Sequence, residues 1–211
     1  MDIHCVPVGP LQANCFLVND SAGVACAIDP GAEPERLAGL LQEWGLTLTH
    51  ILLTHGHFDH LNGAAELAEV TGARIVCHEG VVPMLADPAA YIPFPGFTGA
   101  PGRQPDLLVK EDDVVAVGSL RARVIETPGH SPGDVTYEIE GHLFCGDLLF
   151  YRSVGRTDFP GGDFETLVAS VQKLVDRYPP ATPVHPGHMQ DTVLGDEERA
   201  NPFLAGALRR G

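Results

Sequence analysis

Basic residues are scarce in this sequence. Its 211 residues include 13 lysines and arginines against 28 aspartates and glutamates, so the formal net charge is −15 at pH 7. Proteins that bind nucleic acid draw most of their affinity from clustered lysine and arginine side chains that contact phosphate groups. The composition therefore excludes a phosphate-backbone binder, and we expect no nucleic-acid partner.

Long apolar runs are also missing. No stretch approaches the roughly 20 apolar residues that a membrane-spanning helix needs, and residues 1–10 lack the basic stretch and apolar segment of a secretory leader. The five cysteines form no close pair, and each lies in or beside an apolar run, which is typical of buried thiols in a reducing compartment. We therefore expect a soluble, cytoplasmic protein without a membrane partner.

Short apolar runs and helical patterns fill the chain. With 44% hydrophobic and 19% charged residues, it has the composition and length of a single globular domain over residues 1–211. Apolar periodicity predicts helices at 34–44, 61–70 and 163–178. It predicts strands at 3–8, 15–18, 23–28, 51–54, 74–77, 114–117, 120–127, 135–139, 142–145 and 182–185. This order indicates an α/β fold with its functional residues at strand ends.

One heptapeptide gathers most of the potential metal ligands: Thr54-His55-Gly56-His57-Phe58-Asp59-His60, directly after an apolar run. Imidazole and carboxylate groups suit zinc, iron or manganese. If the chain stays extended, the period of two directs His55 and His57 to the same side, whereas Asp59 and His60 lie past the turn and can face a second point. The spacing suggests two metal positions, and a histidine-rich surface loop is the alternative interpretation.

Four further motifs accompany the heptapeptide in a fixed order. They are Ala27-Ile28-Asp29-Pro30-Gly31, Thr127-Pro128-Gly129-His130-Ser131-Pro132-Gly133, Cys145-Gly146-Asp147-Leu148-Leu149-Phe150 and His185-Pro186-Gly187-His188. Together with His-x-His-x-Asp-His, they resemble the signature of the metallo-β-lactamase superfamily from about Ile3 to the C-terminus. The resemblance implies a four-layer αβ/βα sandwich.

The resemblance also implies two metal ions bridged by Asp147 and a water molecule. The implied ligand sets are His55, His57 and His130 for one ion, and Asp59, His60 and His188 for the other. Two divalent ions, zinc or alternatively iron or manganese, lower the pKa of such a water toward neutrality and polarise a substrate carbonyl. Hydroxide is then the expected nucleophile, with Asp59 and Asp147 as the catalytic carboxylates.

Within the superfamily, the sequence most resembles glyoxalase II, the hydroxyacylglutathione hydrolases. The segments around His130 and Asp147 match motifs of that family, and Arg156 stands where glyoxalase II has a lysine that contacts glutathione. Tyr151 is a second candidate for the same wall of the substrate site, and Asp147 counts against the antibiotic-hydrolysing lactamases. Only residues 189–211 follow His188, so this short tail resembles bacterial forms that lack the C-terminal helical domain.

These motifs imply a binuclear metal-dependent hydrolase that cleaves a small thioester such as S-lactoylglutathione. Two alternatives share the motifs. One is a persulfide dioxygenase with a single iron at the site formed by His55, His130 and Asp147. The other is a hydrolase of the same fold that acts on another ester or on a lactone.

Three features outside the ligand set have a functional and a plain interpretation. Asp29 is either a turn residue before Pro30 or a group that orients a ligand histidine. His185, close to His188 in sequence, is a candidate for a similar supporting role. Residues 87–106, rich in proline, glycine and aromatics, form either a flap over the active site or a loop that packs its aromatic side chains on the domain.

Overall fold

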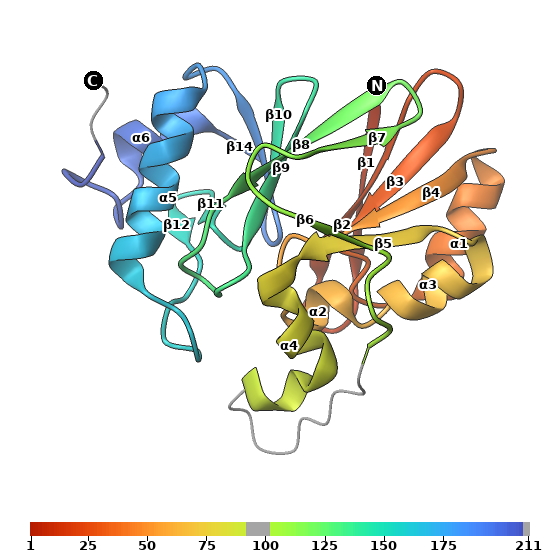
Figure 1. Ribbon diagram of the computed structural model, residues 1–211. Helices are drawn as coiled ribbons and strands as arrows, with labels where there is room; N and C mark the ends of the chain where they lie inside the picture. The colour runs from red at the N-terminus through yellow and green to blue at the C-terminus, as the bar shows by residue number, and fades with distance from the viewer. Residues whose placement is uncertain (92–101, 209–211) are drawn as a thin grey trace.

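Two six-stranded sheets form the centre of the molecule. The computed structural model describes residues 1–91 and 102–208. Helices lie on both outer faces of the pair of sheets, with α1 and α3 against one and α5 and α6 against the other (Figure 1). This arrangement is the expected four-layer αβ/βα sandwich, built from a single domain.

The first sheet contains the N-terminal half of the chain. Its order is β1 (Asp2–Val8), β2 (Ala13–Asn19), β3 (Val24–Ile28), β4 (Thr47–Leu52), β5 (Arg74–His78) and β6 (Leu107–Val109). The first three strands pair antiparallel, and β3 to β6 pair parallel. The helical segments that follow β3, β4 and β5 are α1 (Pro34–Glu43), α2 (Phe58–Leu61), α3 (Ala64–Thr71), the 3-10 turn Glu79–Val81, α4 (Val82–Ala86) and the 3-10 turn Pro88–Tyr91.

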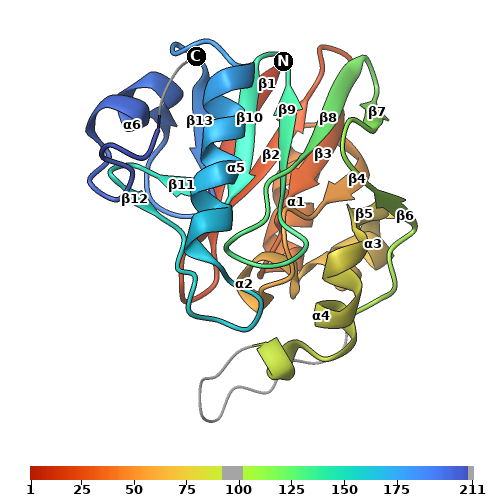
Figure 2. The ribbon, with the colours of Figure 1, turned by 60° about the vertical axis from the view of Figure 1, so that its left-hand side comes forward.

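The second sheet contains the C-terminal half. Its order is β14 (Thr192–Val193), β13 (Pro183–Pro186), β10 (His142–Gly146), β9 (Val135–Ile139), β8 (Leu120–Glu126) and β7 (Val114–Val117). A separate two-stranded hairpin, which lies between β10 and β13 in the chain, consists of β11 (Leu149–Phe150) and β12 (Ser153–Val154). Helix α5 (Phe164–Arg177) crosses the outer face of this sheet, and α6 (Leu194–Ala200) lies beside it (Figure 2).

Three apolar clusters hold the layers together. One packs α1 and α3 on the first sheet through residues such as Leu37 and Leu67. A second, which includes Phe16 and Tyr137, fills the space between the sheets. The third packs α5 on the second sheet through residues such as Leu174. Because successive side chains of a strand point to opposite faces, both faces of each sheet are buried in this way.

The expected elements are present with small changes of boundary. The helix expected over 61–70 is interrupted at Asn62 and Gly63, which separate α2 from α3. The Pro30 carbonyl lies so close to Gly63 that a Cβ on this residue would collide with the carbonyl oxygen. Helix α5 begins as expected after Asp163, whose side chain accepts a hydrogen bond from the Thr166 N–H at 2.7 Å. The expectation for 87–106 falls largely on residues 92–101, which lie outside the described residues.

Short elements escaped prediction from sequence. Strands β6, β11, β12 and β14 have only two or three residues each, too few to show a period, and helices α4 and α6 have five and seven. Within the described residues, no helix has the length and apolar character needed to cross a membrane.

The strands direct the sequence motifs to one edge of the sandwich. Asp29 follows β3, the heptapeptide follows β4, and Asp147 and His188 follow β10 and β13. The loop after β8 carries His130. Because β3 and β4 run parallel to each other, as do β10 and β13, these ends meet where the two sheets adjoin.

Candidate metal centre

The heptapeptide changes conformation within a few residues. His57 is still extended, with φ −74° and ψ 146°, and it caps α2, whose first turn holds Asp59 and His60. The strand end therefore presents His55 and His57, and the helix presents the next two ligand-type side chains. Gly56 is required between the histidines because a Cβ there would lie 2.6 Å from the Cβ of Met84.

The first cluster contains His55, His57 and His130, all buried, with one ligand nitrogen of each within 4.8 Å of the others. Nδ1 of His57 lies 2.7 Å from Nε2 of His130, and the His55 ring centroid lies 5.0 Å from each of the other two centroids. Residues from the segment after β4 and from the β8–β9 loop thus converge on one point.

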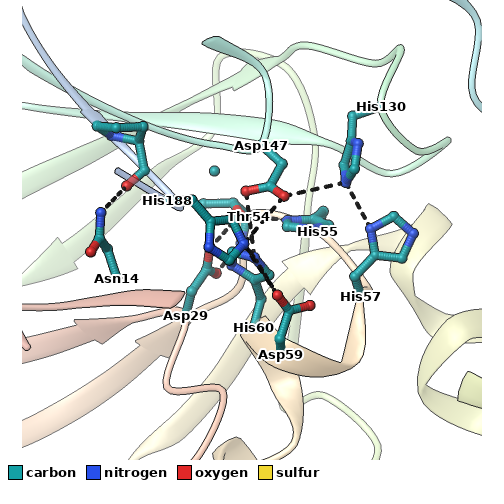
Figure 3. A network of polar contacts seen from close by, with 12 residues as sticks. Asn14, Asp29, Thr54, His55, His57, Asp59, His60, His130, Asp147 and His188 are labelled. Atoms are coloured by element: carbon teal, nitrogen blue, oxygen red, sulfur yellow. Dashed lines mark hydrogen bonds and ion pairs between the residues drawn. The ribbon is translucent and has the colours of Figure 1, made fainter. Parts of the chain in front are cut away.

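The second cluster contains Asp59, His60 and His188, again with ligand atoms within 4.8 Å of one another. Nε2 of His188 lies 3.2 Å from Oδ2 of Asp59 and 3.3 Å from Nε2 of His60. Figure 3 shows these side chains pointing toward one another from α2 and from the segment after β13.

Asp147 lies between the two clusters (Figure 3). Its Oδ1 lies 3.4 Å from Nε2 of His60, and its Oδ2 lies 3.7 Å from Nε2 of His130 and 3.6 Å from Nε2 of His188. A Cβ on Gly187 would collide with Oδ1 of Asp147, so a glycine is needed for His188 to approach this closely. The structure thus places the Asp147 carboxylate within 3.7 Å of histidine nitrogens from both clusters.

The donor atoms of the site fit metal ions. Nε2 of His55 and Oδ1 of Asp147 are buried and have no hydrogen-bond partner in the described part of the protein. A buried polar atom without a partner costs roughly 1–3 kcal/mol, and coordination of a cation would remove that cost. The site therefore has the open donor positions that divalent zinc, iron or manganese requires.

Electrostatics favour the same conclusion. Burial, with the neighbouring histidines, lowers the pKa of His55 well below its usual range and that of His57 to about 3, so both imidazoles are neutral at pH 7 and free to coordinate. Burial also acts to lower the pKa of His60, but Asp147, Asp59 and Asp29 outweigh it and raise this pKa to about 10. The carboxylates thus favour positive charge at the centre, and a divalent ion meets that preference.

Asp29 supports the second cluster from behind. Its Oδ2 lies 3.0 Å from Nδ1 of His60, and its two oxygens accept the Thr54 N–H at 2.7 Å and the Thr54 hydroxyl at 2.5 Å. With Nδ1 of His60 held in this way, Nε2 faces the cluster, which is the arrangement that orients a metal-binding histidine. The same residue also forms the turn before Pro30, with φ 53°, so both interpretations of Asp29 describe the structure.

Arg156 and Tyr151 lie at different distances from the centre. The Arg156 carbonyl lies 2.7 Å from Nδ1 of His130, and its guanidinium lies over the Phe159 ring, which in turn contacts His57. The guanidinium also forms two 2.7 Å bonds with Asp158. Tyr151 is 43% exposed in the β11–β12 turn, where the Arg152 guanidinium lies over its ring.

His185 does not take the supporting position that its place in the sequence suggested. Its ring stacks on Phe144, and its two nitrogens lie 2.9 Å from Nδ1 of His142 and from Oδ2 of Asp191. Strand alternation explains the difference, because in β13 the His185 side chain points into the layer between the sheets, where Phe16 and Phe144 lie. These contacts correct the sequence-based expectation for His185.

Apart from Asp29, sequence reasoning missed the groups that support the ligands. Asp134 is buried, and its carboxylate accepts hydrogen bonds from the N–H and the hydroxyl of Ser131, next to His130. Thr54 and the Arg156 carbonyl were also missed. No local pattern in the sequence indicated these contacts, because most of them depend on how distant segments pack.

The fold and the site define a class of protein. Residues 8–188 match the model of the metallo-β-lactamase superfamily, and the chain belongs to that superfamily. Among its relatives is the hydroxyacylglutathione hydrolase GloC of Haemophilus influenzae, 35% identical over 97% of this chain and 98% of that one.

Several solved structures share the fold of this chain, and they are proteins with different names. The BLEG-1 B3 metallo-β-lactamase has a TM-score of 0.90 and 36% identity, over 97% of this chain and 100% of that one. TTHA1623, solved in a di-iron-bound form, has a TM-score of 0.84 and 41% identity, over 95% and 100%. ETHE1 from Myxococcus xanthus has a TM-score of 0.82 and 30% identity, over 98% and 85%. The superfamily and a His/Asp metal-binding site are thereby shown for this chain.

Proposed function

We propose that this protein is a binuclear metal-dependent hydrolase of small thioesters such as S-lactoylglutathione. One observation carries the proposal: two complete sets of three ligands lie on either side of Asp147. The full-length relationship to a hydroxyacylglutathione hydrolase supports the substrate class. A site for one ion would leave Asp59, His60 and His188 as buried or half-buried ligands without a purpose.

The residues divide the work of the reaction. Bound divalent ions supply acidity for a water molecule and polarisation for a carbonyl oxygen. Asp147 and Asp59 accept hydrogen bonds from the water and orient its oxygen toward the thioester carbonyl carbon. A C–O bond forms between the water oxygen and the carbonyl carbon, and the C–S bond breaks. One proton of the water is transferred to the leaving sulfur and the other is released, so the products are a carboxylate, a proton and a free thiol.

Arg156 is proposed to hold the thiol half of the substrate. Its guanidinium lies on the His57 side of the centre, where a carboxylate of glutathione would take the place that Asp158 occupies. Because the Arg156–Asp158 pair is about half exposed, the exchange of one carboxylate for another costs little. Tyr151, further out on the β11–β12 turn, is proposed to contact the same half.

Persulfide dioxygenase activity is the second candidate. The similarity to ETHE1 from Myxococcus xanthus, 30% identical over 98% of the chain, favours it. This activity requires a single iron ion, held by His55, His130 and Asp147. A hydrolase of another ester or of a lactone is the third. Although Asp147 counts against a lactamase, the BLEG-1 similarity supports including a β-lactam among the test substrates.

Metal analysis with three assays decides among them. The protein as purified is analysed for zinc, iron and manganese, and is assayed for S-lactoylglutathione hydrolysis, for oxygen uptake with glutathione persulfide, and for β-lactam hydrolysis. About two metal ions per chain with thioester cleavage would support the proposal. About one iron per chain with persulfide-dependent oxygen uptake would overturn it in favour of the dioxygenase.

A further inference from the structure

An apolar groove adjoins the second ligand cluster. It lies between the β1–β2 turn, the segment after β3 and α2, and has a volume of about 280 Å³. Its walls include Val8, Leu11, Ala32, Pro34, Phe58 and Asp59. We propose that this groove binds the acyl chain of the substrate, so that the protein prefers thioesters of short, unbranched fatty acids; this inference rests on the proposed function.

The groove shares one residue with the second ligand cluster. Asp59 is one of its walls, and Oδ2 of the same residue lies 3.2 Å from Nε2 of His188 in the second cluster. A substrate whose carbonyl carbon lies beside Asp147 would then place its acyl chain past Asp59, in the groove. The volume is at the lower end of that of ligand pockets, which suits one part of a substrate and not the whole of it.

The walls select for apolar groups. Leu11 is 52% exposed although it is a large aliphatic side chain, which places it at the rim, and Val8 is buried. Each methylene group that leaves water for such a surface contributes about 0.8 kcal/mol, or roughly a fourfold gain in binding. Asp59 is the only ionisable side chain among the described residues of the lining, and it faces the histidines.

The two sides of the centre differ in character. Arg156 lies on the side of the first cluster, through its contact with Phe159 beside His57. The groove lies on the side of the second cluster, at Asp59. A thioester has an acyl end and a thiol end on either side of its carbonyl carbon. If the cation binds the anionic thiol end, the acyl end is directed toward the groove.

The test compares S-acetyl-, S-butanoyl- and S-hexanoylglutathione, which share one thiol. In the metal-loaded wild type we expect kcat/KM to rise at least tenfold from acetyl to hexanoyl. Leu11→Asp places a charge at the rim and should reduce this hexanoyl-to-acetyl ratio at least fivefold, whereas Leu11→Met should retain it. Val70→Asp, an equal change of charge at a 59% exposed position of α3, is the matched control and should leave the ratio unchanged.

A binding measurement without turnover completes the test. Calorimetry on the metal-free protein should give a lower Kd for hexanoyl- than for acetylglutathione, and Leu11→Asp should remove the difference. A ratio near one in the wild type, or one that Leu11→Asp leaves intact, overturns the assignment of the groove alone. Absence of hydrolysis of any thioester by the metal-loaded protein overturns the proposed function and, with it, the assignment.

Discussion

Asp147 is the residue that both ligand clusters share. Its two oxygens lie within 3.7 Å of nitrogens of three histidines, from both clusters. Its carboxylate is mostly buried, so its charge acts on the centre with little screening by solvent. The function of the centre therefore depends on this charge more than on the shape of the side chain.

Asp147→Asn should lower kcat roughly 100-fold or more, because the amide retains the shape but loses the charge that a bridging ligand supplies. The melting temperature of the metal-free variant should stay close to that of the wild type. Asp176→Asn in α5, where the side chain bonds only to Gln172 in the described structure, serves as the control. A variant with the full wild-type rate would contradict the two-metal mechanism.

Asp134 shows how burial determines the charge of a residue near the site. Burial raises the pKa of its carboxyl to about 6, although the hydrogen bonds from Ser131 act to lower it. The folded protein therefore binds a proton at Asp134 more tightly than the unfolded chain does. Above pH 6 the carboxyl is ionised, and the burial of its charge lowers the free energy of unfolding. This loss is relieved as the pH falls from about 6 toward the unfolded value near 4.

Asp134→Asn cannot ionise, so it removes this pH dependence. Relative to the variant, the metal-free wild type should gain roughly 1–3 kcal/mol in free energy of unfolding as the pH falls from 7 to 4. Urea unfolding of both proteins at pH 7, 6, 5 and 4 measures the difference. If it stays constant over this range, Asp134 does not titrate as the structure indicates.

At the scale of elements, α6 anchors the β11–β12 hairpin. Glu197 in α6 is fully buried. Its carboxylate accepts hydrogen bonds from the Arg152 N–H at 2.8 Å, the Thr192 hydroxyl at 2.6 Å and the Asn201 amide at 2.9 Å. One side chain thus joins the C-terminal helix, β14 and the β11–β12 turn that presents Tyr151.

Glu197→Ala should reduce the free energy of unfolding by about 2–4 kcal/mol, because it leaves three donors without their acceptor in a buried position. Glu43→Ala, at the exposed end of α1, should change it by no more than about 0.5 kcal/mol. Chemical denaturation of the metal-free proteins provides both values. Equal stabilities of the two variants would show that the network does not hold α6 in place.

At the scale of the whole molecule, the metal centre joins the two halves of the sandwich. The heptapeptide belongs to the first sheet, and His130, Asp147 and His188 follow strands of the second. Bound ions would therefore connect segments that otherwise meet through the apolar layer between the sheets. Ligand binding to the folded state alone stabilises that state by mass action.

Removal of metal should lower the melting temperature. An ion present at about 1,000 times its Kd contributes about 4 kcal/mol, and for a domain of this size 1 kcal/mol corresponds to about 2–4 °C, so we expect a loss of about 8–16 °C. Calorimetry before dialysis against a chelator, after it, and after zinc is restored measures the change. An identical melting temperature in all three states would mean that the ions do not connect the sheets.

The sequence by itself determined the α/β class, most of the longer strands and helices, and the candidate ligand side chains. These depend on local patterns: the period of two or 3.6, and the short motifs around His55, His130 and His188. The start of helix α5 also followed from a local pattern, because Asp163 is a typical N-cap residue.

Only the tertiary structure decided which distant residues support the site. The contact of Asp29 with His60, the burial of Asp134 and Glu197, and the turning of His185 away from the ligands all depend on packing between segments far apart in the chain. The groove beside Asp59 is formed by three such segments. A sequence pattern shows the periodicity of apolar residues within one segment. The relative position of two segments, by contrast, is determined by the apolar layers that pack between them.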